Sequence, residues 1–227
     1  MNSNALNNPE QTAYRYRGRI IGGICFIALF CLIAWLVIHG YTHRIDHRVQ
    51  YFAYSTRNGV TDRILVPITY MAHKYFIIAV IAVLLAIPRT RTEYGLPLAL
   101  SSSLGLLPYK ILKTTIARPR PNPARWLVIE HGFSFPSGHS MNGLIFYGML
   151  IFLIRRSSLS RDQKNVLTVV FGLLIPLIGW TRLFCGVHYV SDVFGGWTLG
   201  LAWVLLVSCL IDLCRQKTAS KKKKQIS

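Results

Sequence analysis

The pair of residues with the clearest chemical potential is His188 and Asp192, which lie four positions apart. On a helix, two side chains with this spacing share one face, so the carboxylate could accept the Nδ1–H of the imidazole. That hydrogen bond would fix the tautomer and leave the lone pair of Nε2 free for nucleophilic attack. The alternative is a His/Asp pair that only satisfies its own hydrogen bonds at a helix end.

A second cluster is Pro136-Ser137-Gly138-His139, which opens a long apolar stretch. Ser137 is a good N-cap, and Gly138 would let a ligand approach the backbone closely. Free N–H groups and the positive end of the helix dipole favour an anion there, with His139 in the first turn. The alternative is an ordinary capped helix start.

Three cations complete the set, namely Lys113, Arg120 and Arg182. An Arg can direct two N–H donors at one oxyanion group, whereas a surface cation only extends toward the lipid head groups. Arg182 is hardest to explain as a surface residue, because Leu183 to Val187 offer no charge partner. Three cations, a helix start and two histidines together could bind a tetrahedral dianion and supply a nucleophile and an acid, as metal-free phosphoryl transfer requires.

These clusters resemble the signature of the type 2 phosphatidic acid phosphatase (PAP2) superfamily, K-x6-R-P, P-S-G-H and S-R-x5-H-x3-D. The matching segments are Lys113…Arg120-Pro121, Pro136-Ser137-Gly138-His139 and Thr181-Arg182…His188…Asp192, in that order. The spacing selects Lys113 rather than Lys110, and Thr181 replaces the usual Ser but keeps a hydroxyl. The resemblance covers about residues 60 to 205.

The resemblance implies a role for each motif residue. His188 would attack phosphorus and become a phosphohistidine, with Asp192 orienting it. His139 would protonate the leaving oxygen and later help water to attack. The residues that would hold the phosphoryl oxygens are Lys113, Arg120, Ser137, Gly138 and Arg182. No metal and no other cofactor is implied.

Composition places these residues in a membrane protein. Residues of the apolar and aromatic types make up 52% of the 227 positions, and only 15% are charged, against roughly 25% in soluble domains. This composition excludes a disordered or coiled-coil chain, and the length fits one domain over residues 1–227. The net charge of +18 would suggest nucleic acid in a soluble protein. Here most cations lie between apolar stretches, so membrane lipids are the expected partners and nucleic acid is not.

Six apolar stretches could each cross a bilayer of about 30 Å. They cover residues 20–40, 64–88, 95–117, 137–154, 165–184 and 190–214. The expected fold class is therefore all-α, a polytopic membrane protein with six transmembrane helices. The first stretch lacks a small-residue cleavage site and is expected to remain as an anchor. After it, Ile45, Val49 and Phe52 recur at helical spacing, which favours either a short helix in the outer interface or an ordinary polar loop.

The distribution of Lys and Arg predicts the orientation. The N-terminal segment 1–19, the loops after the second and fourth stretches and the basic tail 215–227 hold 15 of them, and the alternate loops hold 7. The positive-inside rule then places both termini in the cytoplasm and all three clusters outside it. No N-x-[ST] site occurs, which agrees with a bacterial cytoplasmic membrane.

Three further ionisable residues, His73, Lys74 and Lys110, lie within the apolar stretches. His73 and Lys74 lie in the outer half of the second stretch, where an ionisable side chain suggests function. Lys74 could instead extend outward to the head groups. Lys110 lies one turn from Lys113 and either adds positive potential to the pocket or covers the helix surface.

The leading hypothesis is a metal-independent hydrolase, a phosphatase acting on a membrane lipid phosphate or pyrophosphate at the outer face. Candidate substrates are undecaprenyl pyrophosphate, phosphatidylglycerophosphate and phosphatidic acid. Vanadate haloperoxidases share the motifs but are soluble. A non-enzymatic transporter or lipid-binding scaffold is the alternative from another class, and it would be expected to lose one of the two histidines. The lipid, the pathway and the oligomeric state stay open.

Overall fold

A computed structural model describes the backbone of residues 9–226 and the side chains of residues 16–214. Over this range the chain is helical and has no strand, which confirms the all-α prediction. The helices are α1 (Pro9–Ile38), α2 (His43–Ser55), α3 (Gly59–Thr69), α4 (Lys74–Ala86), α5 (Pro88–Thr90), α6 (Leu96–Ile116), α7 (Gly138–Arg156), α8 (Arg161–Phe184) and α9 (Val190–Ile226). Two 3-10 turns, η2 (Tyr70–Ala72) and η4 (Pro123–Arg125), and a π-helical turn, η3 (Arg91–Gly95), complete the elements. The side chains of the predicted polar start before residue 16 and of the basic tail lie outside the described residues.

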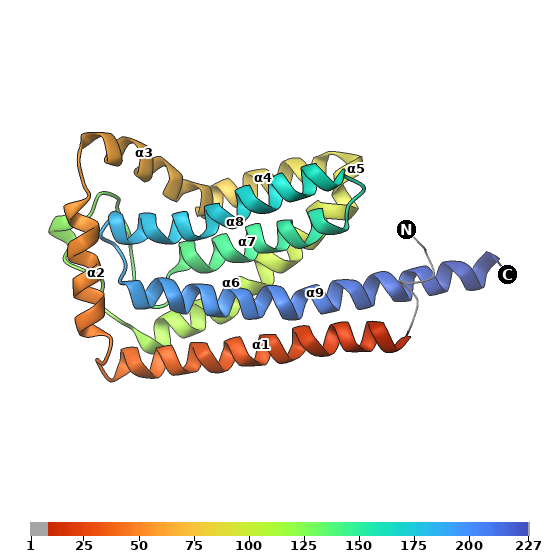
Figure 1. The fold of residues 1–227 in the computed structure, drawn as a ribbon, viewed down its shortest axis with the longest axis horizontal. Helices are drawn as coiled ribbons and strands as arrows, with labels where there is room; N and C mark the ends of the chain where they lie inside the picture. The colour runs from red at the N-terminus through yellow and green to blue at the C-terminus, as the bar shows by residue number, and fades with distance from the viewer. Residues whose placement is uncertain (1–8, 227) are drawn as a thin grey trace.

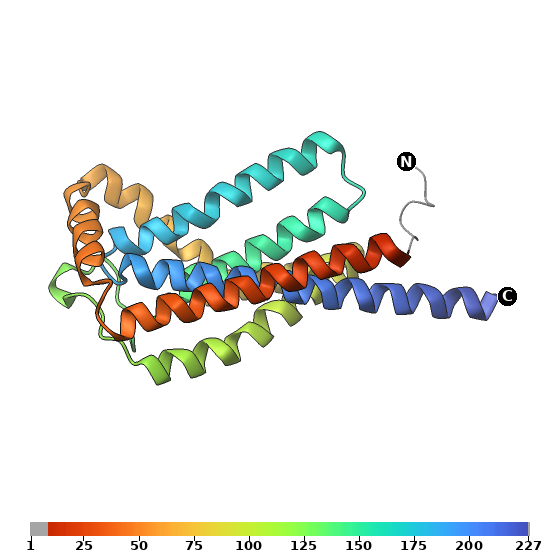
Figure 2. The ribbon, with the colours of Figure 1, turned by 60° about the horizontal axis from the view of Figure 1, so that its bottom comes forward.

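The long helices run side by side as a bundle with α7 inside it (Figures 1 and 2). Helix α7 packs against α6, α8 and α9, and α1 lies along α9. The largest buried cluster is apolar and includes Ile77 of α4, Phe146 and Met149 of α7 and Ile178 of α8. Large apolar side chains such as Ile24 also cover the outside of the bundle. A bundle that is apolar both inside and outside is suited to a lipid environment.

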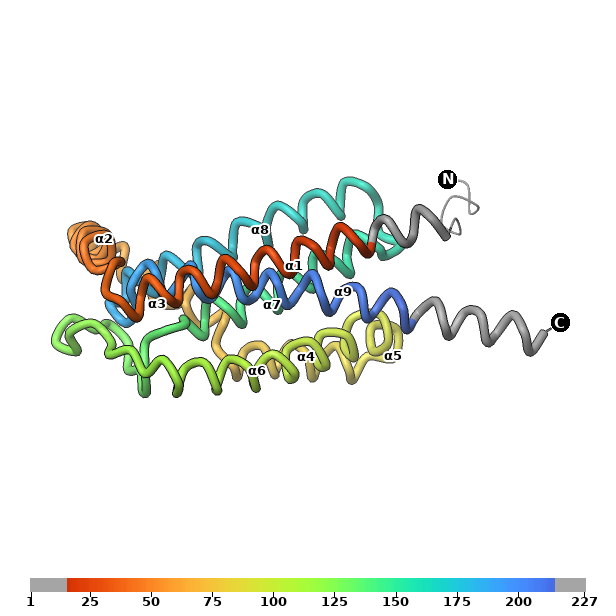
Figure 3. The backbone as a smooth tube through the Cα atoms, turned by 90° about the horizontal axis from the view of Figure 1, so that it is seen from below, coloured from red at the N-terminus to blue at the C-terminus, as the bar shows by residue number. Residues whose placement is uncertain are grey.

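Helix α2 crosses one end of the bundle (Figures 1 and 3), whereas the start of α1 and the end of α9 lie at the opposite end in Figure 1. The short helix predicted after the first stretch is therefore present, and the alternative of a polar loop is wrong. Its buried face carries Asp46, Gln50 and Ala53, while Ile45 and Phe52 are exposed. The apolar side chains that suggested the helix thus point mainly away from the bundle.

Three helical segments are long and apolar enough to cross a membrane: Tyr16–Ile38, Arg161–Phe184 and Val190–Cys214. A fourth is reached if the bent pair Gly59–Ala72 and Lys74–Ala86 counts as one span. Helices α6 and α7 occupy the third and fourth predicted stretches but are not among these segments. The count of six spans is therefore not confirmed.

The second predicted stretch, residues 64–88, is wrong as a single straight helix. The chain bends by 57° between η2 and α4. The bend lies at His73, whose backbone is extended, with φ −72° and ψ 143°. The Nδ1 atom of His73 accepts a hydrogen bond from the amide of Tyr75 at 3.5 Å, so the histidine caps the new helix. The outer half of the stretch, in α3 and η2, therefore runs in a different direction from α4 (Figure 1).

Candidate active site

All three predicted clusters meet near the end of the bundle covered by α2. Each side chain is presented by the end of a long helix or by an adjoining loop. Lys113 lies in the last turn of α6, and Arg120 lies in the loop after it. The start of α7 is formed by Ser137, Gly138 and His139. Arg182 lies in the last turn of α8, and His188 and Asp192 lie on either side of the start of α9. The start of α7 presents free amides to this group, and the last turns of α6 and α8 contribute the side chains of Lys113 and Arg182.

The contact between His188 and Asp192 is present, but the geometry differs from the prediction. Helix α9 begins at Val190, so His188 lies in the turn before the helix rather than on its face. The turn still brings Nδ1 of His188 to 3.4 Å from Oδ2 of Asp192. Asp192 accepts a hydrogen bond from the amide of Tyr189 at 2.7 Å, which holds the turn against the helix start.

Ser134 completes the contact on Nδ1. Its hydroxyl lies 3.3 Å from Nδ1 of His188 and donates to Oδ2 of Asp192 at 2.5 Å. Since that proton goes to the carboxylate, the oxygen of Ser134 can accept the Nδ1–H of the imidazole. Both neighbours of Nδ1 therefore favour the tautomer that leaves a lone pair on Nε2.

Arg120 contacts the other ring nitrogen. Its Nη1 lies 3.1 Å from Nε2 of His188. Three backbone carbonyls fix the guanidinium, those of Val187 at 2.9 Å, Gly132 at 3.0 Å and His131 at 3.1 Å. An Arg can only donate, so Nε2 accepts in this contact.

The imidazole of His188 is 1% exposed, and its surroundings favour the neutral form. Burial lowers the pKa of His188 well below its ordinary value, and the positive charges of Arg120, Lys113 and Arg182 lower this pKa further. A neutral imidazole with a lone pair on Nε2 is the form that can act as a nucleophile.

Arg182 is the largest fully buried side chain in the described part of the chain, with an exposure of 1%. Its Nη1 donates to Oγ1 of Thr69 at 2.6 Å, and its Nη2 forms an ion pair with Glu130. Its Nε has no hydrogen-bond acceptor among residues 16–214. A buried donor without an acceptor is costly, and an anionic ligand would supply the missing partner.

One carboxylate, that of Glu130, contacts several groups predicted to hold phosphate. Besides Arg182, it lies 3.5 Å from Nη2 of Arg120 and 3.7 Å from Nδ1 of His139. Glu130 belongs to the loop between α6 and α7 and is 20% exposed. The two arginines and the histidine therefore converge on one negatively charged group, as they would have to converge on a phosphoryl group.

The start of α7 has the predicted form. The hydroxyl of Ser137 caps the helix by accepting from the amide of Ser140 at 3.4 Å and from its hydroxyl at 2.9 Å. A Cβ atom on Gly138 would lie 2.5 Å from the hydroxyl of Tyr109, so any other residue would require the ring of Tyr109 to move. The amides of Gly138 and His139 have no acceptor within the helix and are available to an anion.

Lys113 connects the first cluster to the second. Its Nζ donates to the carbonyl of Pro136 at 3.2 Å and lies 5.0 Å from the ring centroid of Tyr109. The amide of Ser137 in turn donates to the carbonyl of Asp192 at 3.0 Å. These backbone contacts fix the distance between the start of α7 and the start of α9.

Four site residues were missed from the sequence: Arg118, Asp46, Ser134 and Glu130. Arg118 donates to Asp192 at 2.6 Å and to Asp46 at 2.7 Å, and so links α2 to the start of α9. For Asp46 and Glu130 the sequence carried one signal, the scarcity of acidic residues. The chain holds only 8 of them, and each one outside the segments assigned to the cytoplasm is a candidate partner for a buried cation. Nothing in the spacing of Ser134 marks it.

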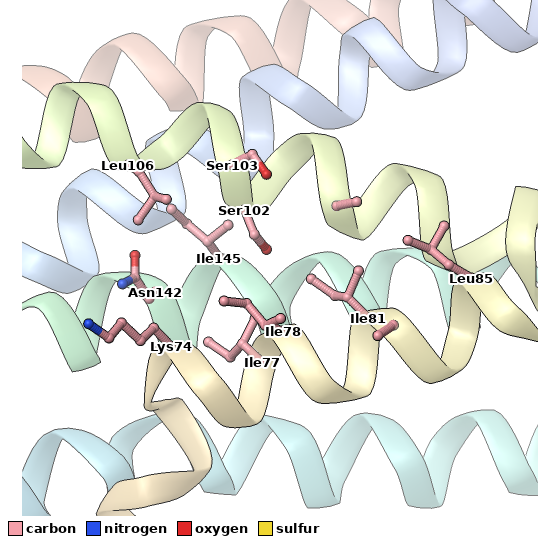
Figure 4. Close-up of a pocket in the computed structure, with 12 residues that line it drawn as sticks. Lys74, Ile77, Ile78, Ile81, Leu85, Ser102, Ser103, Leu106, Asn142 and Ile145 are labelled. Atoms are coloured by element: carbon pink, nitrogen blue, oxygen red, sulfur yellow. The ribbon is translucent and has the colours of Figure 1, made fainter.

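Two cavities adjoin these residues. A polar cavity of about 270 Å³ is lined by His139, Arg182, Glu130, His73 and Lys74, among others. An apolar groove of about 330 Å³ lies between α4, α6 and α7 (Figure 4). Lys74 lines both cavities.

The arrangement offers a neutral nucleophile, a second histidine and three cations close to one another, and of these His139 and Arg182 line the polar cavity. Free helix amides and the guanidinium groups can stabilise negative charge on three oxygens of a phosphoryl group. No group of three or more His, Cys, Asp or Glu within residues 16–214 could hold a metal ion. The expectation that catalysis needs no metal stays a prediction.

Comparisons with known proteins point to one family of phosphatases. A family model described as the PAP2 superfamily matches residues 92–215. The chain is 33% identical over 183 residues to phosphatidylglycerophosphatase B of Bacillus subtilis strain 168, covering 79% of this chain and 90% of that protein. It is 27% identical over 178 residues to an undecaprenyl-diphosphatase of Sulfolobus acidocaldarius, covering 76% and 79% of the two proteins. The crystal structure of a transmembrane PAP2-type phosphatidylglycerolphosphate phosphatase from Bacillus subtilis superposes with a TM-score of 0.76 at 28% identity, covering 84% of this chain and 96% of that one.

Proposed function

This chain belongs to the PAP2 superfamily and is a phosphatase of that family, and on this premise we propose that it dephosphorylates a membrane lipid phosphate or diphosphate through a phosphohistidine. The observation that carries the proposal is the environment of His188. Its Nδ1 faces Asp192 and Ser134, and its Nε2 faces Arg120, a predicted phosphate ligand. A transporter or scaffold, the alternative from another class, has no need of such an arrangement.

In the first step, Nε2 of His188 attacks phosphorus while the phosphoryl oxygens lie between Arg120, Arg182, Lys113 and the first amides of α7. The new P–N bond forms as the P–O bond to the lipid breaks. His139 gives a proton to the departing oxygen, which leaves as an alcohol or, from a lipid diphosphate, as the lipid monophosphate.

In the second step, His139 accepts a proton from water, and the water oxygen attacks the phosphohistidine. The P–N bond breaks, inorganic phosphate forms, and His188 recovers its lone pair. Asp192 and Ser134 hold the imidazole through both steps, and they stabilise the positive ring of the intermediate. The arginines and lysine balance the charge that spreads over the three equatorial oxygens.

The apolar groove between α4, α6 and α7 supports a lipid as substrate. It is lined by aliphatic side chains such as Ile77, Ile81 and Leu85, and it adjoins the polar cavity at Lys74. A hydrocarbon tail could lie there while the phosphate lies against His188, since burying apolar surface is favourable in such a groove. The relatives named above act on phosphatidylglycerophosphate and undecaprenyl diphosphate, and these two lipids with phosphatidic acid are the candidate substrates here.

We further propose that residues 1–227 form a single domain with six membrane spans, with both termini in the bacterial cytoplasm and the site on the outer side. The excess of Lys and Arg in the segments assigned to the cytoplasm supports this orientation. It also agrees with the position of the site at the end of the bundle opposite the start of α1.

The test is phosphate release by the purified protein in detergent, measured with a panel of polyprenyl diphosphate, phosphatidylglycerophosphate and phosphatidic acid. EDTA is present in one arm, and His188→Ala is the inactive control. We expect release from at least one lipid, unchanged by EDTA, and none from the variant. Activity that disappears in EDTA and returns with a divalent ion would contradict the metal-independent mechanism.

A further inference from the structure

Lys74 is the one ionisable side chain that lines both cavities. The polar cavity also contains His139, and the groove is apolar along the rest of α4. Lys74 therefore lies where the polar cavity meets the apolar groove, a junction called the neck below. A lipid substrate would place the boundary between its phosphate and its hydrocarbon tail at this neck. Its neighbour His73 lies close to the reacting groups, with its ring centroid 5.7 Å from that of His139.

Asn142 is a second polar side chain at this neck. It lies on α7 one turn after His139 and lines the apolar groove. Lys74 and Asn142 occupy the same end of the groove, and Leu85 lies toward the other (Figure 4). A cation and an amide at one end of an apolar groove are the pattern expected where a ligand is polar at one end only.

Neither side chain has a hydrogen-bond or ion-pair partner in the described part of the chain. No acidic residue within 16–214 forms an ion pair with Lys74, whose Nζ lies 5.0 Å from the ring centroid of Tyr75. The half-buried amide of Asn142 has no hydrogen-bond partner in the described part of the chain. Its amide atoms are not among the buried polar atoms without a partner, so they are open to a ligand group at the neck.

We propose that Lys74 and Asn142 form a subsite for a second phosphate, one that lies between the reacting phosphate and the lipid tail. This inference rests on the proposed function. A polyprenyl diphosphate carries such a phosphate directly next to the reacting one, and phosphatidylglycerophosphate carries a phosphodiester one glycerol away. Phosphatidic acid has no second phosphate. The subsite therefore selects between classes of lipid phosphate. It binds a part of the substrate that lies away from the bond that breaks.

The test compares kcat/KM for a polyprenyl diphosphate, phosphatidylglycerophosphate and phosphatidic acid in wild type, Lys74→Met and Asn142→Leu. Loss of a charge-assisted contact in Lys74→Met should lower kcat/KM by about 10- to 100-fold for a substrate with the second phosphate, and Asn142→Leu should lower it by about 2- to 10-fold. The values for phosphatidic acid should change by less than about threefold, which also shows that the variants are folded. The matched control is Lys110→Met, because Lys110 is an exposed lysine on α6. This variant should leave the ratio of kcat/KM between the lipids with and without a second phosphate unchanged.

The pattern of loss identifies the ligand. A loss on the polyprenyl diphosphate alone assigns the subsite to a diphosphate, and a loss on phosphatidylglycerophosphate alone assigns it to a phosphodiester. Equal changes on all three lipids, or no change on any, would overturn the subsite while wild-type turnover of phosphatidic acid left the proposed function standing. A wild-type protein that is inactive on all three lipids would reject the proposed function, and the subsite with it.

Discussion

Nη1 of Arg120 lies 3.1 Å from Nε2 of His188, so a predicted phosphate ligand donates to the nitrogen predicted to attack phosphorus. One N–H group cannot donate a strong hydrogen bond to the imidazole and to a phosphoryl oxygen at the same time. On our account, the arriving phosphoryl group accepts this donor and leaves the lone pair of Nε2 free at the same moment. The contact would therefore protect a neutral nucleophile until substrate binds.

The pH dependence of kcat/KM tests the neutral state of His188. Burial and the charges of Arg120, Lys113 and Arg182 lower the pKa of His188, so the reactive neutral form should persist as the pH falls below about 6.5. Arg120→Gln removes a positive charge, which should raise this pKa and move the acid limb to higher pH. A soluble aryl phosphate as substrate avoids effects of lipid ionisation. An acid limb that stays in place or moves to lower pH would contradict the assignment.

Ser134 should position His188 without touching the substrate. In Ser134→Ala, the Nδ1–H keeps only the 3.4 Å contact with Asp192, so the imidazole should be less well oriented. We expect kcat to fall by about tenfold with little change in KM. Ser157→Ala, at the far end of α7, removes a similar hydroxyl contact and is the matched control. A larger effect on KM than on kcat would assign Ser134 to substrate binding instead.

The sequence predicted the residues that lie together, but not the contacts that hold them in place. His188, His139 and the three cations could be found because their types and spacings are unusual beside apolar helices. Glu130, Ser134 and Asp46 could not be assigned, because each acts on a residue more than 50 positions away in the chain. Such pairs depend on tertiary packing, which a local pattern does not contain.

The same limit applies to the fold. Hydropathy located the long helices, because a long apolar stretch of sequence is typical of a helix that crosses a membrane. It missed the 57° bend at His73, where a side chain replaces a backbone partner and starts a new helix. A sliding average of hydropathy does not register one capping contact, although the bend decides which residues line the polar cavity.

Glu130 should compete with anionic ligands for the arginines. Its carboxylate contacts Arg182, Arg120 and His139, and a phosphoryl group would need the same donors. Glu130→Gln removes the negative charge with little change in shape, so vanadate and phosphate should inhibit at about three- to tenfold lower concentration. The measurement is the inhibition constant of each anion. Weaker inhibition in the variant would mean that Glu130 mainly holds the arginines in position.

The orientation can be tested in the same loop. Ile129 is 86% exposed and lies next to Glu130, so a cysteine there should be accessible without disturbing the core. In a background without the five native cysteines, Ile129→Cys should react with a membrane-impermeant thiol reagent on intact cells. A cysteine in place of Lys164, which lies near the start of α8 at the opposite end, is the matched control and should react only after lysis. The reverse pattern would place the site on the cytoplasmic side.

The central claim is that the phosphoryl group passes through His188, and rapid-quench trapping of labelled phosphate on the protein tests it most directly. His139→Ala is the best background, because an activated aryl leaving group needs little protonation, whereas release of phosphate needs the base. We predict that this variant accumulates an acid-labile, base-stable phosphoenzyme, and that His139→Ala combined with His188→Ala forms none. An adduct that still forms at the same level in the double variant would contradict the assignment of the nucleophile.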